Sequence, residues 1–274
     1  TEIEGIPTSI NKECSFTILY ARSLENGQFS MKRDAYSFRT LEVTKKEVSQ
    51  WQKRTELLNG WSYAYKFRSD FSACYGMALS SAAYFTDSQL KPANFRNIPT
   101  VEYDVTDQDI TDNIILYQYA QAIPNVYNQW SEKSFDGFYN SLQHSLSENI
   151  PCIIGLNMSA DESNPVHANL AYCLIEDHEN NRAVLSLYEN QNYTKVGLIE
   201  MDTKSKIVTP YETGGDIYRF FRCIPVVPKG IYETEKEIIE ALKLDLSSSG
   251  KTLATAECPV RVLITDEEGN RTGF

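Results

Sequence analysis

The spacing of apolar residues changes near residue 150, and this change constrains the fold more than any other feature of the sequence. Before it, apolar residues recur at helical spacing, as Phe138, Leu142 and Leu146 do. After it, short apolar runs alternate with turns rich in Asn, Asp and Gly, a pattern typical of strands. Helices followed by an antiparallel sheet indicate the α+β class, which is the fold class that we expect.

The expected elements follow from the same two periods. We expect helices over 42–58, 74–85, 111–122 and 134–148. We expect strands over 151–157, 166–175, 182–188, 197–201 and 218–227. A loop region carrying Pro92 and Pro99 separates the second helix from the third.

The chain divides into three parts by composition. Residues 1–40 are mixed and polar, and we expect an irregular or strand-bearing leader that packs on the main domain. That domain is expected over 41–228, since 274 residues suffice for one large domain or a medium one with an appendage. Within 229–274 we expect a short helix, a flexible Ser-Ser-Ser-Gly-Lys joint and the truncated β-hairpin of a following module.

Charge and hydropathy exclude several classes of partner. Hydrophobic residues make up 42% of the chain, so a sizeable core is available. The formal net charge of −11 argues against nucleic acid or an anionic membrane as a main partner, because both would be repelled. No run approaches the roughly 20 apolar residues that span a bilayer. We expect no nucleic-acid partner and no membrane span.

The cysteines and histidines do not have the spacing of a metal site. The six Cys are scattered without a CxxC pattern, and the three His are dispersed without HExxH spacing. A metal enzyme is therefore disfavoured, and we expect neither a metal nor another cofactor. Cys152, Cys173 and Cys223 lie in strand-like apolar runs, where a buried structural thiol is the expected role.

Cys74 differs from the other cysteines because it stands at the expected start of a helix. Ser72, just ahead of it, is a candidate helix cap. A helix N-terminus stabilises a thiolate through the helix dipole and its unpaired N–H groups. The following Tyr75-Gly76 allows another segment to approach closely. Cys74 is the candidate nucleophile.

His167 is the best placed of the three histidines to serve as a base. His144 lies on a polar helix face, and His178 lies in the turn Glu-Asp-His-Glu-Asn-Asn. His167 opens an expected strand directly after a Ser-Asn-Pro turn, so its ring can project from the edge of a sheet. A lone strand histidine is more often an ordinary polar residue. Its occurrence together with Cys74 favours a catalytic base.

A catalytic imidazole also needs an acceptor for its second nitrogen. The strand 182–188 is followed by Glu189 and Asn190, and strand pairing would bring them near His167. Neighbouring strand residues face opposite ways, so only one of the two can serve. Both could also be ordinary polar turn residues, since Gln191 and Asn192 follow.

Two segments resemble a known family. SACYGMALSSAAYF resembles the nucleophile helix of papain-like bacterial cysteine peptidases. VHANLAYCLIEDHENNRAVLSLYENQNY resembles their histidine strand, hairpin and third-residue strand. The similarity extends over roughly 61–227 and includes the double-glycine-cleaving peptidases of bacteriocin export, which have the same three elements.

The resemblance implies a papain-like fold, with N-terminal helices and the nucleophile helix packed on an antiparallel sheet. It implies Cys74 as nucleophile, His167 as base and Glu189 as third member, with Asn190 as the papain-style substitute. The implied activity is hydrolysis of peptide or isopeptide bonds in a protein or peptide substrate.

Two positions depart from the family pattern. The third residue of the family is normally Asp or Asn, and Glu is longer by one methylene. Arg68 stands where papain-like enzymes place a Gln that stabilises the oxyanion. The Cys74 backbone N–H, with Ser69 or Ser72, would then have to stabilise this charge.

The departures keep alternatives open. The first is a catalytically impaired papain-like module that acts in binding or adhesion at a bacterial cell surface. The second is transfer of the acyl group to an amine in place of water. The segment CPVRVLITDEEGNRTGF resembles the opening hairpin of immunoglobulin-like modules of bacterial surface proteins, so we expect an extracellular or cell-surface location. The sequence indicates neither the oligomeric state nor the substrate sequence.

Overall fold

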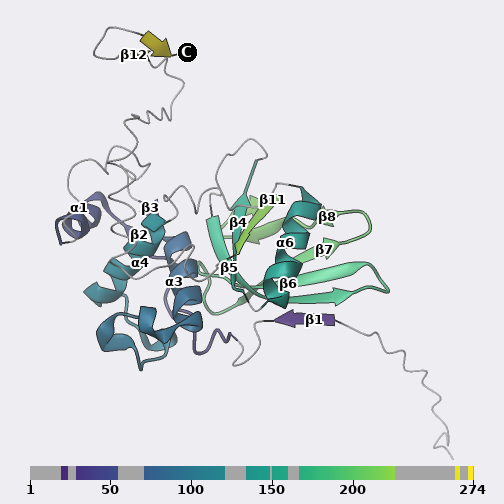
Figure 1. Cartoon of the computed structure of the whole chain (residues 1–274), viewed down its shortest axis with the longest axis horizontal. Helices are drawn as coiled ribbons and strands as arrows, with labels where there is room; N and C mark the ends of the chain where they lie inside the picture. The colour runs from purple at the N-terminus through teal and green to yellow at the C-terminus, as the bar shows by residue number, and fades with distance from the viewer. Residues whose placement is uncertain are drawn as a thin grey trace, which may run out of the picture.

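The computed structural model describes residues 20–23, 29–54, 71–120, 134–148, 150–159, 167–225, 263–265 and 271–273. Helices and an antiparallel sheet pack together, which confirms the α+β class (Figure 1). The α-helices are α1 (Lys45–Arg54), α3 (Cys74–Thr86), α4 (Gln108–Ala120) and α6 (Phe135–Ser147). Three short 3-10 helices are η1 (Ser88–Leu90), η2 (Ala93–Phe95) and η3 (Thr100–Glu102).

The main sheet has seven strands, and its described pairs are antiparallel. Its strand order is β11-β4-β5-β6-β7-β8, and β1 also pairs with β5. The strands of this sheet are β1 (Tyr20–Ser23), β4 (Cys152–Asn157), β5 (His167–Asp177), β6 (Arg182–Tyr188), β7 (Val196–Asp202), β8 (Ile207–Val208) and β11 (Phe220–Pro225). The small sheets contain β2 (Glu42–Val43) with β3 (Phe71–Ser72), β9 (Tyr211–Thr213) with β10 (Asp216–Tyr218), and β12 (Leu263–Thr265) with β13 (Arg271–Gly273).

Helix α3 forms the centre of the core. Every residue from Cys74 to Tyr84 is buried, and the helix packs against both α4 and β5 (Figure 1). Its small residues allow this burial on all sides. A Cβ atom on Gly76 would lie 2.3 Å from the backbone oxygen of Ile114 in α4, so only glycine permits this approach between the two helices.

Helix α6 packs on the sheet at β11 and β5 (Figure 1). Phe138, Leu142 and Leu146 are buried on its inner face, as the helical spacing predicts. A polar contact joins the same surfaces, since the fully buried carboxylate of Glu176 accepts hydrogen bonds from Tyr139 and Gln143 at 2.6 and 2.5 Å. A buried carboxylate is tolerated where such donors surround it.

Most expected elements occur within one to three residues of their predicted bounds, and three expectations are wrong in detail. Helix α1 begins at Lys45, because residues 42–43 pair with β3 and Thr44 caps the helix through Glu47 in a capping box. Residues 218–227 do not form one strand, since Arg219 separates β10 from β11.

The third error concerns the start of α3. Ser72 does not cap this helix, because it belongs to β3 and Ala73 occupies the N-cap position. The backbone still supports the helix start, since the Ala73 N–H donates to the Leu41 carbonyl at 2.8 Å. The first turn of α3 is thus held by the segment that precedes α1 in the chain.

The two ends of the chain are described in part. Within the expected leader, β1 pairs with β5 in register from Tyr20 opposite Glu176 to Ser23 opposite Cys173. Near the C-terminus, β12 pairs antiparallel with β13. The expected short helix and the Ser-Ser-Ser-Gly-Lys joint lie outside the described residues. Within the described part of the chain, no helix combines the length and hydropathy needed to cross a membrane.

Candidate active site

The fold brings Cys74 and His167 together. Cys74 is the first residue of α3 and His167 is the first residue of β5, and these two elements pack against each other. Their side chains interact, since Cys74 is one of the groups that raise the pKa of His167. Their exposed fractions are 7% and 3%, so the pair is almost closed to solvent.

Strand register explains how Glu189 reaches His167. Strands β5 and β6 pair with Leu170 opposite Tyr188, so the residue after Tyr188 arrives beside the first residues of β5. Oε1 of Glu189 lies 3.4 Å from Nε2 of His167. Since Glu189 engages Nε2, Nδ1 is the ring nitrogen that remains for Cys74. The imidazole therefore has a carboxylate at one ring nitrogen and the other nitrogen left to interact with the thiol.

The Glu189 carboxylate is held from several directions. Oε1 also accepts from the Gln191 backbone N–H at 2.9 Å. Oε2 accepts from Nδ2 of Asn169 at 2.9 Å and from the Tyr211 hydroxyl. Glu189 is 3% exposed, so these donors replace water around the charge.

Burial and hydrogen bonding compete at His167 and Glu189. Burial disfavours the charged imidazole, but hydrogen bonds and charge interactions with Cys74 and Glu189 raise the pKa of His167 to about 9. Burial likewise disfavours the carboxylate, but His167, Tyr211 and the Gln191 N–H lower the pKa of Glu189 to about 2. At neutral pH the pair is an imidazolium facing a carboxylate.

An aromatic ring covers the imidazole. The ring of Tyr218, at the end of β10, is stacked on His167 with the centroids 5.8 Å apart and the planes inclined by 29°. Tyr218 is itself 2% exposed. This contact restricts rotation of the imidazole out of line with Glu189.

The described hydrogen bonds of the Asn190 side chain do not include the imidazole of His167. They go to the backbone carbonyls of Cys74 and Ala168, at 2.9 and 2.8 Å, and to the Thr40 hydroxyl. Of the two candidate orienting residues, Glu189 contacts the imidazole and Asn190 contacts the backbone of the candidate nucleophile.

The candidate oxyanion donors are described only in part. Arg68 and Ser69 lie outside the described residues, and Ser72 is half-buried in β3. In the first turn of α3, the Gly76 N–H donates to Oε1 of Gln118, a buried residue of α4, at 2.6 Å. The Cys74 N–H belongs to the same turn, where backbone N–H groups lack partners within the helix.

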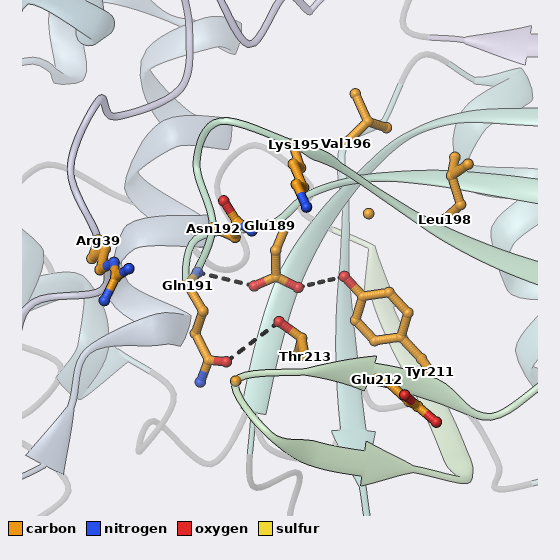
Figure 2. A pocket seen from close by; sticks show the side chains of 12 residues that line it. Arg39, Glu189, Gln191, Asn192, Lys195, Val196, Leu198, Tyr211, Glu212 and Thr213 are labelled. Carbon is orange, nitrogen blue, oxygen red and sulfur yellow. Dashed lines mark hydrogen bonds between the residues drawn. The ribbon is translucent and has the colours of Figure 1, made fainter.

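A pocket of about 420 Å³ lies beside Glu189 (Figure 2). Figure 2 shows the carboxylate between Gln191 and Tyr211 and bonded to both. Arg39, Lys195 and Glu212 bring charge to the lining. Glu189 is the member of the Cys74–His167–Glu189 group that lines this pocket.

The remaining cysteines and histidines occupy ordinary positions. Cys152 and Cys223 are buried, as expected, and Cys173 is half-buried. His144 and His178 are exposed. Cys14 and Cys258 lie outside the described residues. Among the residues with described positions, no group of three or more His, Cys, Asp or Glu side chains could hold a metal ion.

Sequence reasoning missed the residues that surround the candidate group. Asn169 stands two residues after His167 on the same face of β5, so strand alternation could have identified it. Other residues around the group come from distant segments of the chain, and no local pattern marks them: Thr40, Gln118, Tyr211 and Tyr218.

Comparison of the chain with models of protein families, with curated proteins and with solved structures finds no match.

Proposed function

We propose that this protein is a papain-like cysteine peptidase that hydrolyses peptide or isopeptide bonds. The observation that carries the proposal is that α3 packs on β5, the elements that begin with Cys74 and His167, while the Glu189 carboxylate lies 3.4 Å from the imidazole. A thiol at a helix start, paired with an imidazole that a carboxylate orients, is the arrangement that nucleophilic acyl transfer requires.

The chemistry begins from an ion pair in which the Sγ proton of Cys74 already resides on His167, giving a thiolate beside an imidazolium. The thiolate attacks the carbonyl carbon of the substrate, and the carbonyl oxygen takes up the negative charge beside the Cys74 N–H. Collapse of this intermediate breaks the C–N bond, and His167 gives its proton to the leaving amine. The product of this half-reaction is a thioester on Cys74.

Hydrolysis of the thioester restores the enzyme. His167, now neutral, accepts a proton from water while the water oxygen attacks the thioester carbon. The C–S bond breaks, and the acid product leaves. An amine in the place of this water would give acyl transfer. Glu189 stays ionised throughout, since its low pKa keeps it the charge partner of the imidazolium.

The proposal extends to the setting of the enzyme. The resemblance to secreted and surface proteins supports an extracellular or bacterial cell-surface location. The antiparallel pair β12–β13 is consistent with the opening of an immunoglobulin-like module of the kind found in bacterial surface proteins.

The direct test is alkylation of the native protein with iodoacetamide at pH 6, followed by peptide mapping. Cys173 is an internal control, because it is more exposed than Cys74 and burial raises the pKa of its thiol. We expect Cys74 to react at least roughly 10-fold faster than Cys173, since Cys74, unlike Cys173, lies beside an imidazole in the proposed site. Reaction of Cys74 no faster than Cys173 contradicts the proposal.

A cleavage assay is the second test of the proposal. We expect the protein to cleave an unfolded protein or a peptide library, and the Cys74→Ala variant to be inactive. Cleavage that survives Cys74→Ala would come from another site or from a contaminant and would also contradict the proposal.

A binding or adhesion module with an impaired site is the second candidate. Two observations favour it: the near-complete burial of Cys74 and His167, and the position of the described pocket at Glu189. Slow alkylation of Cys74 together with no cleavage of any peptide would support this candidate.

A further inference from the structure

One buried carboxamide joins three separate segments of the chain. Asn190 has no solvent exposure and stands at the end of β6. Its side chain contacts the first residue of α3, the second residue of β5 and the segment that precedes β2. These segments lie far apart in the sequence and meet at the candidate active site.

Both the nitrogen and the oxygen of the Asn190 carboxamide form hydrogen bonds. Nδ2 donates to the carbonyl of Cys74 at 2.9 Å and to the carbonyl of Ala168 at 2.8 Å, so both of its hydrogens are engaged. Oδ1 accepts from the Thr40 hydroxyl at 2.9 Å, and the Asn190 carbonyl accepts from the Thr40 N–H at 2.8 Å. Thr40 thus fixes which end of the carboxamide faces the two carbonyls.

The two carbonyls that Asn190 contacts lie at the candidate nucleophile and beside the candidate base. One is the carbonyl of Cys74 itself, and the other is that of the residue directly after His167. A single nitrogen bonded to both fixes the separation of the two backbones at the positions where the thiol and the imidazole must meet.

We propose that Asn190 is a positioning residue that sets the Cys74–His167 separation, and that Thr40 locks its carboxamide in the required orientation. This inference rests on the proposed Cys74–His167 chemistry. It assigns Glu189 and Asn190 different tasks: Glu189 orients the imidazole ring, and Asn190 holds the backbone that carries the ring close to the backbone that carries the thiol.

The position of the two residues allows this division. Glu189 and Asn190 follow β6 directly, and their side chains make different contacts. One side chain reaches the face that carries His167 and Asn169, while the other reaches the start of α3. Two consecutive polar residues can therefore act on the same catalytic pair.

The test uses Asn190→Ala and Thr40→Val, with Asn180→Ala as control. Asn180 is an exposed residue of the turn between β5 and β6, at the other end of the hairpin. Two measurements are made on each protein: the pKa of His167 by NMR titration of its imidazole, which is tractable with three histidines in the chain, and the rate of Cys74 alkylation at pH 6.

In Asn190→Ala we expect the pKa of His167 to fall from about 9 toward its ordinary value, because the interaction with Cys74 that raises this pKa weakens as the backbones separate. We expect Cys74 alkylation to slow by roughly 10-fold or more. Thr40→Val should shift both quantities in the same direction by less, and Asn180→Ala should leave them unchanged.

A purely structural role would lower the unfolding temperature without moving either quantity in the folded protein. A folded Asn190→Ala protein with the wild-type His167 pKa and alkylation rate would overturn the inference. If Asn190→Ala does not fold, Thr40→Val decides by the same criterion. Slow alkylation of Cys74 in the wild type would contradict the proposed function instead, so the two failures are distinguishable.

Discussion

Nε2 of His167 lies 3.4 Å from Oε1 of Glu189, and other donors hold the carboxylate more closely than the imidazole does. The Gln191 N–H and Nδ2 of Asn169 both lie 2.9 Å from its oxygens. The carboxylate is therefore oriented by the surrounding fold, and the imidazole aligns to it. Its hydrogen bond and its negative charge both raise the pKa of His167.

Replacing Glu189 by Gln tests this charge. Glu189→Gln keeps the shape of the side chain but removes the anion, so the pKa of His167 should fall from about 9. The alkaline limit of activity, where the imidazolium loses its proton, should move to lower pH. We expect kcat/KM to fall by roughly 10- to 1,000-fold.

The matched control is Glu212→Gln, which removes an exposed carboxylate from the same pocket. We expect it to leave the pH profile in place. Equal shifts in the two variants would mean that the profile responds to general surface charge and not to Glu189.

The stability of the protein should depend on pH through the same pair. His167 has a raised pKa in the folded state, so its stabilising contribution is complete below its ordinary value of 6.5 and is lost as the pH rises through about 9. Glu189 has a lowered pKa, so its contribution is complete above its ordinary value of 4.5 and is lost as the pH falls toward 2.

The two contributions overlap between pH 4.5 and 6.5. Unfolding temperatures of the wild type and Glu189→Gln, measured from pH 5 to pH 9.5, should differ most near pH 6 and converge toward pH 9.5. A difference that grows with pH would contradict the raised pKa of His167.

Tyr211→Phe removes one donor from the ionised carboxylate. The pKa of Glu189 should then rise from about 2 toward its ordinary value, because the Tyr211 hydrogen bond favours the charged form. The acid limit of activity should move to higher pH, and the free energy of unfolding should fall by about 1–2 kcal/mol. The pH profile of kcat/KM and urea unfolding measure the two effects. Tyr193→Phe, on the exposed loop before β7, should show neither.

Gly197→Ala reaches the same hydrogen bond from another direction. A Cβ atom on Gly197 would lie 2.4 Å from the Tyr211 hydroxyl, so one of the two must shift, and we expect the bond between this hydroxyl and Glu189 to weaken. The acid limit should shift in the same direction as in Tyr211→Phe. A wild-type acid limit in Gly197→Ala would show that the hydroxyl keeps its bond despite the methyl group.

Gly76→Ala tests the packing of the nucleophile helix. The new methyl group would meet the Ile114 backbone oxygen at 2.3 Å, and a backbone atom cannot move aside as a side-chain end can. We expect a loss of about 1–3 kcal/mol in the free energy of unfolding, despite the better helix propensity of alanine. Chemical denaturation measures it, and a variant as stable as the wild type would show that α3 and α4 separate without cost.

The sequence was sufficient to predict the elements whose apolar pattern is local. Helix α3 begins at its predicted residue and strand β5 begins one residue after its predicted start, so Cys74 and His167 could be placed at the start of their elements. The choice between Glu189 and Asn190 could not be made, because it depends on the register between β5 and β6. A shift of one residue would exchange the faces of the two side chains.

Contacts between distant segments were the other source of error. Residues 42–43 are too few to show a strand pattern of their own, so the apolar spacing places them in the following helix. Their pairing with β3 is what identifies them as a strand. The partners of Glu189 on β9, and of Asn190 before β2, are common residue types at positions without a motif. Only the three-dimensional fold brings them to the site.

Strand β1 has a practical consequence for shortened versions of this protein. It pairs with β5 at Cys173–Glu176, beyond the last β5 residue that pairs with β4, so β4 and β1 cover successive lengths of the same edge. A version that begins at Glu42 would leave this part of β5 with unpaired N–H and C=O groups. Such an edge can pair with the same edge of a second molecule, so self-association of the shortened protein would reflect a missing strand rather than a native assembly.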